Sequence, residues 1–177
     1  MHATDLRPAR IEDAADIARV HVETWQATYA PFMPATYLAG LSVERHAAQH
    51  GETLRRPDPH GVFLVGTVGG EVRGFARAGR SRDGQRPDDG ELYAIYVHPD
   101  THGSGLGRML MDGVRTRLRT AGFRRAHLWV VTGNERAEAF YRAAGWWHDG
   151  DTHLFRIPGA DVPERRYVTT LDPQPER

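Results

Sequence analysis

The stretch from residue 91 to residue 107 constrains the fold more than any other part of the chain. Residues 92–97 are aliphatic or aromatic, which favours a buried strand, and Pro99 ends it because proline has no N–H to donate to a ladder. Gly103, Gly105 and Gly107 follow, where the strand would pass into a helix. Without Cβ atoms these glycines let backbone N–H groups face an anion beside the positive end of a helix dipole. The stretch therefore predicts a strand, a phosphate-binding turn and a helix.

The hydrophobic pattern of the whole chain predicts alternating strands and helices. Strands are expected at residues 6–11, 62–68, 71–78, 91–97, 125–132, 146–157 and 166–171. Helices are expected from Glu12, within 32–41, at 43–55 behind a Ser42 cap, from Arg108 to Ala121 and at 135–144. The polar residues 80–90 indicate a mobile loop. This order predicts an α+β fold, with a mixed, mostly antiparallel sheet of six or seven strands and helices on both faces.

Composition favours a single domain over residues 1–172, followed by a disordered tail at residues 173–177. A chain of 177 residues can bury about two-thirds of its unfolded surface, so it needs no disulfide or structural metal. Cysteine is absent, and neither an apolar leader nor a membrane-length apolar run is found, which favours a cytoplasmic protein without a membrane partner. The formal net charge is zero, which argues against a dedicated nucleic-acid binder.

The glycine turn alone does not identify the ligand. Arg108 stands where the dinucleotide fingerprint has its third glycine, and no acidic residue ends the next strand. The Gly-Lys-Ser/Thr sequence of a P-loop does not follow either. The ten histidines are interpreted as scattered surface residues, so no metal site is predicted.

The turn becomes specific through the motifs that accompany it. These are Val97-His98-Pro99, Gly105-Leu106-Gly107, Asn134-Glu135-Arg136-Ala137, Phe140-Tyr141 and Gly145-Trp146. Together they resemble the GCN5-related N-acetyltransferase (GNAT) superfamily, and in particular its bacterial members that act on small molecules. The resemblance covers most of the chain, from Leu6 to about Trp147.

The resemblance implies that the chain binds acetyl-CoA as a co-substrate and needs no metal. In the family the central strand splays from its neighbour, and its main chain pairs with the pantetheine arm, here at Ile95, Tyr96 and Val97. The pyrophosphate would lie on the turn formed by His102, Gly103, Ser104, Gly105, Leu106, Gly107 and Arg108. The family usually has glutamine or arginine at the position of His102, so a contribution of this side chain does not follow from the resemblance.

Two residues of the last predicted helix match family positions that act on the cofactor. Asn134 matches an asparagine that touches the cofactor arm, and Tyr141 matches the tyrosine that protonates the departing CoA thiolate. A phenol is protonated at neutral pH and can donate this proton. The alternative for Tyr141 is a core aromatic residue beside Phe140.

An amine must lose a proton before it can attack a thioester, and Glu91 is the candidate base. Its alternative is a solvent-exposed acid at the start of the strand, and His98 and Tyr93 are the reserve candidates. Trp25 and Tyr29 either wall a pocket for the acceptor or close the core.

Three functions remain open from the sequence. The leading one is acetyl transfer from acetyl-CoA to a primary amine of a small molecule, by direct attack in a ternary complex. In an alternative form of this function, the acceptor is a peptide or protein amine. The second is an acyl-CoA sensor without turnover, and the third is a nucleotide-binding oxidoreductase, which the broken fingerprint disfavours. The amine and the oligomeric state, a homodimer included, are not determined by the sequence.

Overall fold

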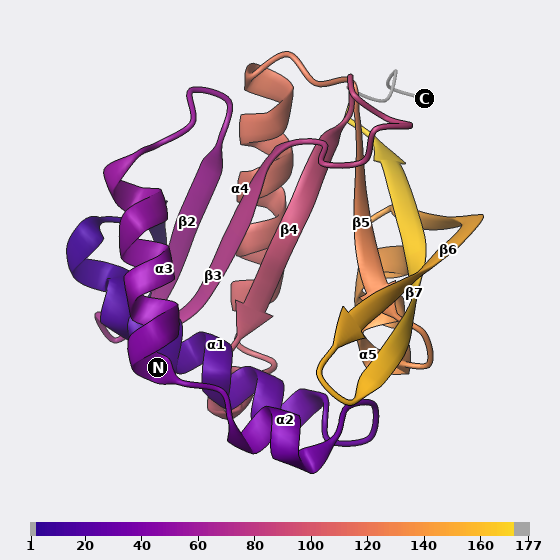
Figure 1. Ribbon diagram of the computed structural model, residues 1–177. Helices are drawn as coiled ribbons and strands as arrows, with labels where there is room; N and C mark the ends of the chain where they lie inside the picture. The colour runs from indigo at the N-terminus through magenta and orange to yellow at the C-terminus, as the bar shows by residue number, and fades with distance from the viewer. Residues whose placement is uncertain (1–2, 172–177) are drawn as a thin grey trace.

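The computed structural model describes residues 3–171, so the predicted tail at residues 173–177 lies outside the described part. A seven-stranded sheet runs through it in the order β1-β2-β3-β4-β5-β7-β6 (Figure 1). Its strands are β1 (Thr4–Pro8), β2 (Val62–Val68), β3 (Glu71–Arg80), β4 (Gly90–Val97), β5 (Arg125–Val131), β6 (Trp147–Ile157) and β7 (Ala160–Thr170). All neighbours are antiparallel except β4 and β5, which confirms the predicted mixed and mostly antiparallel sheet.

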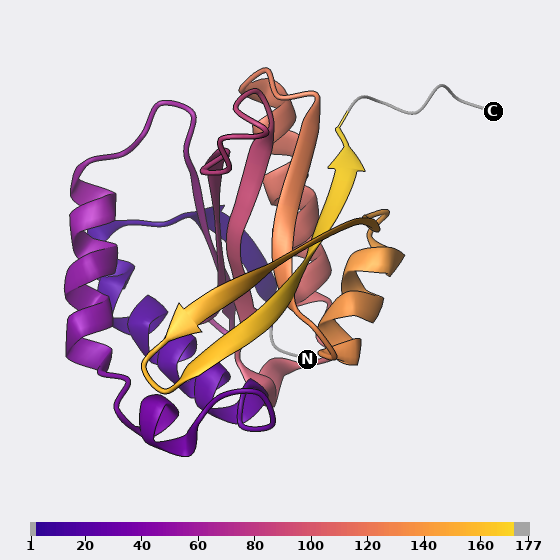
Figure 2. The ribbon, with the colours of Figure 1, turned by 45° about the vertical axis from the view of Figure 1, so that its right-hand side comes forward.

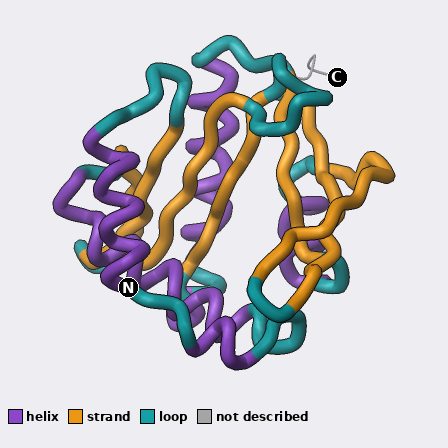
Figure 3. The backbone as a smooth tube through the Cα atoms, viewed as in Figure 1, coloured by secondary structure: helices purple, strands orange, loops and turns teal. Residues whose placement is uncertain are grey.

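Helices cover both faces of this sheet, as predicted (Figure 3). They are α1 (Ala14–Thr28), α2 (Ala35–Ala39), α3 (Val43–Arg55), α4 (Leu106–Thr120) and α5 (Glu135–Ala143), with 3-10 turns η1 (Ile11–Asp13) and η2 (Pro99–Thr101). The apolar stripe of α4 packs on one face, and Ile17 and Val20 of α1 pack against Val65 and Phe75 on the other. Within residues 3–171, no helix combines the length and apolar character needed to cross a membrane.

The sheet opens between its two parallel strands. β4 and β5 pair only through Gly90 with Ala126 and Glu91 with His127. Beyond these pairs the strands diverge (Figure 1), so the edge of β4 that faces β5 has no strand partner. We call this opening the splay. Parallel strands that separate in this way expose backbone N–H and C=O groups that another extended chain can pair with.

A β-bulge in β4 accompanies the splay. Arg77 of β3 pairs with Ala94 and Ala78 pairs with Leu92, which leaves Tyr93 as the extra residue on β4. A bulge of one residue bends the strand and interrupts the alternation of its side chains. Ala94 therefore packs on the α1 side although Leu92, two residues earlier, packs on the α4 side.

Most predicted boundaries agree with the structure within two residues, but those of the first and last strands, β1 and β7, differ. β1 ends at Pro8, and Ile11 begins η1 instead of ending a strand. β7 begins at Ala160, six residues before the predicted Arg166, so the prediction missed the first half of this strand. Pro163 pairs in register with Leu154 of β6, and its carbonyl oxygen accepts a hydrogen bond from the Thr132 N–H at 2.9 Å, just beyond the end of β5.

Three histidines form a cluster where α1 meets α3, which corrects the interpretation of the histidines as scattered surface residues. His46 and His50 are one turn apart on α3, a spacing that the sequence interpretation overlooked. His21 Nδ1 lies 3.1 Å from His50 Nε2, and His50 is 3% exposed. Burial first, and then the charges of nearby histidines and Arg77, lower the pKa of His21 to about 3 and that of His50 to about 4.

We expect these two histidines to make folding stability depend on pH between 7 and 5. Their pKa values are lower in the folded protein than in the unfolded chain, so the unfolded chain binds more protons and gains stability as the pH falls below about 6.5. The free energy of unfolding should fall by roughly 1–2 kcal/mol for each histidine. Urea denaturation of His50→Gln at both pH values should show a smaller change than the parent, with the exposed His148→Gln as the control. An identical change in His50→Gln and parent would contradict this account.

Candidate active site

The turn between β4 and α4 has the geometry of an anion cradle. Gly103 and Gly105 have φ angles of 84° and 85°, which side chains rarely allow, and a Cβ at either would meet nothing within 4 Å. Among residues 3–171, no hydrogen-bond partner is found for the backbone N–H groups of Gly103, Gly105, Gly107 and Arg108. They lie at the N-terminus of a 15-residue helix, where the dipole favours negative charge. The predicted turn therefore offers free donors on open backbone.

The strand that leads into this turn is fixed at its end by a histidine. His102 Nε2 lies 3.0 Å from the carbonyl oxygen of Val97, so the side chain ties the turn to β4. Ile95 and Val97 pack into the core beneath α4, whereas Tyr96 lies on the opposite face against His21. This contact gives His102 a structural task beside the cofactor role predicted for the turn. That cofactor role stays a prediction.

The start of α5 lies on the other side of the splay. Gly133 has a φ of 88°, and the Asn134 side chain caps the helix by accepting a hydrogen bond from the Ala137 N–H at 3.2 Å. The Tyr141 ring packs between Phe140 and Tyr167, at centroid distances of 5.5 and 6.2 Å. No described residue hydrogen-bonds to its hydroxyl group, and burial raises its pKa above the ordinary value. The phenol is therefore protonated at neutral pH and free to donate.

Glu91 lies at the closed end of the splay and is 3% exposed, so it is not the exposed strand-end acid of the alternative prediction. It accepts a 2.7 Å hydrogen bond from the Arg82 N–H and 2.6 and 3.1 Å bonds from the Arg82 guanidinium. His127 Nε2 is 3.7 Å away, too far for a hydrogen bond. Burial alone would raise the pKa of Glu91, but the nearby His127 ring and above all Arg82 hold it at about 2. A carboxylate with so low a pKa is a weak base, so these contacts do not favour the predicted role.

The two reserve candidates also have partners. His98 Nε2 lies 2.7 Å from Glu23 of α1, and the Tyr93 hydroxyl group donates to the Arg80 carbonyl oxygen. Among the residues of the described range, no group of three or more His, Asp or Glu side chains could hold a metal ion.

Aromatic side chains of α1 lie beside Tyr96 at the open end of the splay. Trp25 is 5.0 Å from Tyr29 and 6.3 Å from Tyr96 between ring centroids. Trp25 and Tyr29 both belong to the apolar cluster around Met33 and Leu38, so they contribute to the core. The Trp25 indole N–H is buried among these aromatic rings. Their predicted acceptor role therefore stays open.

Two further ionisable residues near the splay were missed from the sequence. Glu164 of β7 pairs in register with Val131 at the end of β5 on one side and with His153 of β6 on the other. Glu164 was missed because β7 was predicted to begin only at Arg166, and its pairing with His153, which lay within a predicted strand, was missed with it. Val162, Glu164 and Arg166 share one face of the strand, but only Val162 is apolar, so no hydrophobic alternation marks this segment in the sequence.

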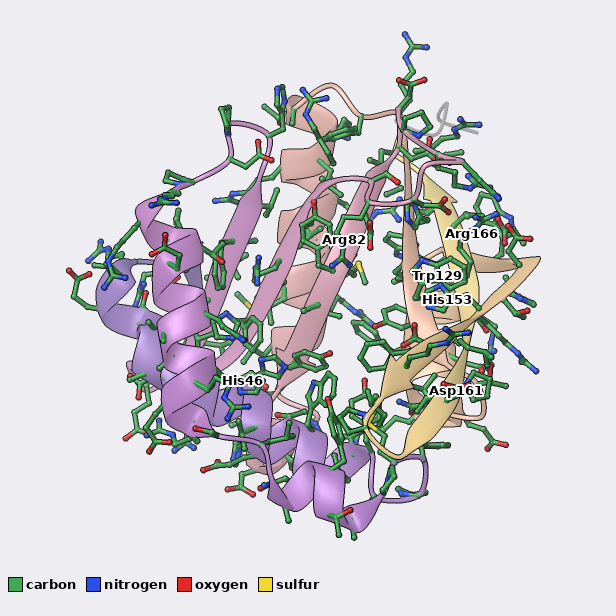
Figure 4. All side chains as sticks on the ribbon, in the orientation of Figure 1. His46, Arg82, Trp129, His153, Asp161 and Arg166 are labelled. Carbon is green, nitrogen blue, oxygen red and sulfur yellow. The ribbon has the colours of Figure 1, made fainter. Side chains whose placement is uncertain are left out.

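The loop between β3 and β4, predicted to be mobile, is held by ion pairs. Arg166 of β7 contacts Asp83 at 3.0 Å, Asp149 at 2.9 Å and Asp151. Arg86 joins the same network through Asp149 at 2.8 Å. Figure 4 shows Arg82 reaching from this loop towards the splay, with Trp129, His153 and Arg166 together on the opposite side. The loop and the last hairpin therefore frame one face of the splay.

Comparison with known proteins shows similarity at the level of a family. The model of the acetyltransferase (GNAT) family matches residues 19–146. The uncharacterized N-acetyltransferase YuaI of Bacillus subtilis is 36% identical over 138 residues, which cover 78% of this chain and 77% of that protein. A mycothiol acetyltransferase of Nocardiopsis dassonvillei is 36% identical over 117 residues, which cover 63% of this chain but only 34% of that protein.

Solved structures show the same fold at lower sequence identity. The PaiA N-acetyltransferase of Thermoplasma acidophilum, solved in complex with coenzyme A, has a TM-score of 0.74 at 19% identity and covers 95% of this chain and 99% of that one. The yncA protein of Salmonella typhimurium, a putative acetyltransferase solved with its cofactor acetyl-CoA, has a TM-score of 0.72 at 19% identity, with coverage of 98% and 97%.

We expect the Glu91 carboxylate to stabilise the fold. Glu91→Gln should lower the free energy of unfolding at pH 7 by about 1–3 kcal/mol, because the amide is a weaker partner for Arg82 in a buried site. Since the folded pKa is about 2 and the unfolded value 4.5, this contribution is present above pH 4.5 and is lost as the pH falls towards 2. Urea denaturation should therefore show parent and variant converging at low pH. The exposed Glu71→Gln is the matched control, and equal stability of Glu91→Gln and parent at pH 7 would refute the expectation.

Proposed function

The chain belongs to the acetyltransferase (GNAT) family, and we propose that it transfers the acetyl group of acetyl-CoA to a primary amine of a small molecule. One observation carries this proposal: the unpartnered amides of Gly103, Gly105, Gly107 and Arg108 adjoin the unpaired edge of β4. A ligand with a phosphate group and an extended amide-containing arm matches both features. Acetyl-CoA has this chemistry.

The arrangement supports a specific placement of the co-substrate. The pyrophosphate would lie on the turn, where the two positive-φ glycines leave room for close approach to the backbone. The pantetheine arm would extend along β4 at Ile95, Tyr96 and Val97, with its amides replacing the missing strand partner. Asn134 would stand across the splay, where its capping bond fixes the orientation of its amide.

The chemical step we propose is direct transfer in a ternary complex. The neutral amine attacks the thioester carbonyl carbon, a C–N bond forms, and the C–S bond breaks with its electron pair moving to sulfur. The Tyr141 hydroxyl group would donate a proton to that sulfur, since it has no other described partner and is protonated at neutral pH. The chain contains no cysteine, so no thiol of its own can carry the acetyl group between the two substrates.

A small-molecule acceptor is the favoured class. The relatives named mycothiol acetyltransferases support it, although the match covers a third of the Nocardiopsis protein. The two other acceptor outcomes are a peptide or protein amine, and no acceptor at all in an acyl-CoA sensor. All 23 basic residues of the chain are arginines, so an acetyl-lysine signal in an assay with a lysine peptide must come from the peptide.

The direct test is thiol release from acetyl-CoA with a panel of amines. Phenethylamine, putrescine, glucosamine and glycinamide represent small acceptors, and a lysine-containing peptide represents the alternative. Amine-dependent thiol release with a small acceptor is the expected result. Release with the peptide alone would change the acceptor class. Tight acetyl-CoA binding without release for any amine would indicate a sensor and overturn the proposal.

Binding of acetyl-CoA should depend on the open backbone of the turn. Gly105→Glu places a side chain and a negative charge beside the free amides, so we expect acetyl-CoA affinity to fall at least 10²-fold in calorimetric titration. Gly70→Glu in the β2–β3 hairpin is the matched control, because Gly70 also has a positive φ, 87°, and open space around its Cβ position. If both variants fold and bind acetyl-CoA like the parent, the turn is not the phosphate site.

Turnover should depend on the Tyr141 hydroxyl group. Tyr141→Phe keeps the ring packing and removes the proton donor, so kcat should fall by about 10²-fold while the dissociation constant for acetyl-CoA stays within a few fold. Tyr167→Phe is the control, because the Tyr167 hydroxyl group donates to Glu138 of α5 and lies outside the proposed chemistry. Full activity of Tyr141→Phe would show that Tyr141 is not the proton donor. Loss of acetyl-CoA binding would indicate that the hydroxyl group supports the structure of the binding site instead.

A further inference from the structure

The proposed reaction requires a group that takes a proton from the acceptor amine, and Glu91 is poorly suited to this task. Its carboxylate is occupied by three hydrogen bonds from Arg82, and its low pKa makes it a weak base. Glu164 is a partly buried carboxylate near the splay that no step of the proposed chemistry uses. Its side chain is 15% exposed.

The position of Glu164 follows from the register of the last three strands. Val131, Glu164 and His153 form one row across β5, β7 and β6. Val162, two residues before Glu164 and on the same face of β7, packs in the cluster that includes Trp25 and Tyr29. The intervening strand residues, such as Arg165, point to the other face, where Arg165 meets Glu138 of α5. Glu164 therefore points to the face that carries the predicted acceptor residues. Figure 2 shows the β6–β7 hairpin crossing in front of this part of the sheet.

One oxygen of Glu164 is paired and the other is free. His153 Nε2 lies 2.7 Å from Oε2. The His153 ring stacks on Trp129 with 3.8 Å between ring centroids and 22° between the planes, which fixes the direction of its nitrogens. In the described part of the chain, no donor contacts Oε1 of Glu164. This oxygen is therefore available to a ligand, in contrast to both oxygens of Glu91.

The charged and titratable groups around Glu164 place it next to the proposed chemistry. Burial first, and to a smaller extent the negative charge of Glu164, raise the pKa values of three phenols: Tyr29 of the acceptor side, Tyr96 of β4 and Tyr141, the proposed acid. Burial raises the pKa of Glu164 itself, while His153 and the charge of Arg82 act in the opposite direction. A raised pKa makes the carboxylate a better proton acceptor than an ordinary one.

We propose that Glu164 is the proton acceptor for the amine and that His153 carries the proton on to solvent. This inference rests on the proposed acetyl transfer. An ammonium proton passes to Oε1, which leaves a neutral amine whose lone pair attacks the thioester carbon. While the carboxylate is charged, the His153 Nε2–H donates to Oε2. Once Oε1 is protonated, the carboxyl group turns to present its proton to the ring, His153 in its Nδ1–H tautomer accepts it at Nε2, and the half-exposed ring releases the Nδ1 proton to water. The proton that the nitrogen loses after attack follows the same route, while Tyr141 protonates the sulfur and regains its own proton from solvent.

The kinetic test compares Glu164→Gln with the parent, using the small amine of the panel that gives the fastest thiol release. At pH 7 the variant should lose about 10²-fold in kcat/KM with unchanged acetyl-CoA affinity. The deficit should shrink as the pH rises towards the pKa of the free amine, because the amine then arrives deprotonated. Glu23→Gln is the matched control, since Glu23 forms a second Glu–His pair, with His98, also at 2.7 Å. If Glu23→Gln loses turnover and Glu164→Gln does not, His98 rather than Glu164 accepts the proton of the amine, and the proposal is overturned.

A spectroscopic test does not depend on turnover. The Glu164 carboxyl carbon can be titrated by NMR in the parent and assigned by its absence in Glu164→Gln. His153→Gln removes a group that lowers the pKa of Glu164, so the titration should move to higher pH, and kcat/KM should fall with a changed acid limb. An unmoved titration overturns the role of His153. If the parent acetylates an amine and Glu164→Gln has the same activity at every pH, the role of Glu164 is refuted while the proposed function stands. If the parent acetylates no amine, the proposed function itself is refuted.

Discussion

The separation of β4 from β5 after two paired residues is the constraint on which the rest of the structure depends. A sheet normally satisfies its backbone groups between neighbours, and an open edge within it is costly unless something else pairs with it. Here the bulge at Tyr93 bends β4 away, and its other edge is kept in the sheet by β3. The opening places unpaired backbone, a free-amide turn and the Tyr141 phenol around one space. The fold thus forms the candidate site by omitting hydrogen bonds between β4 and β5.

Sequence patterns predicted the elements around this site because each has a local physical signal. The Ser42 hydroxyl group accepts from the Arg45 N–H as expected of a cap, and the Gly69-Gly70 turn adopts the positive φ angles that a tight hairpin needs. The strand, turn and helix from Gly90 to Thr120 lie as predicted, except that α4 begins at Leu106, two residues early. These signals involve neighbours in sequence and need no knowledge of the fold.

The parts that the sequence did not predict depend on contacts between distant residues. Glu91 was predicted as a candidate base, and its ion pair was missed because nothing local indicates that Arg82 would fold back over it. Polar Glu164 and Arg165 next to Pro163 concealed the first half of β7, although its pairing with both β5 and β6 outweighs their weak strand preference. The histidine cluster likewise requires α1 and α3 to meet. Charge partners and protonation states emerge only from tertiary structure.

The place of β7 between β5 and β6 also has a consequence for how the molecule is made. β5 gains seven of its pairs from β7 and only two from β4, yet β7 is translated almost thirty residues after β5. During synthesis the edge of β5 that pairs with β7 therefore stays unpaired until β7 has been translated. The part of the sheet made of β2, β3 and β4 can form early, because these strands follow one another in the chain. The part made of β5, β7 and β6 forms only when residue 170 has left the ribosome. Nascent chains are therefore most exposed to aggregation at the unpaired edge of β5.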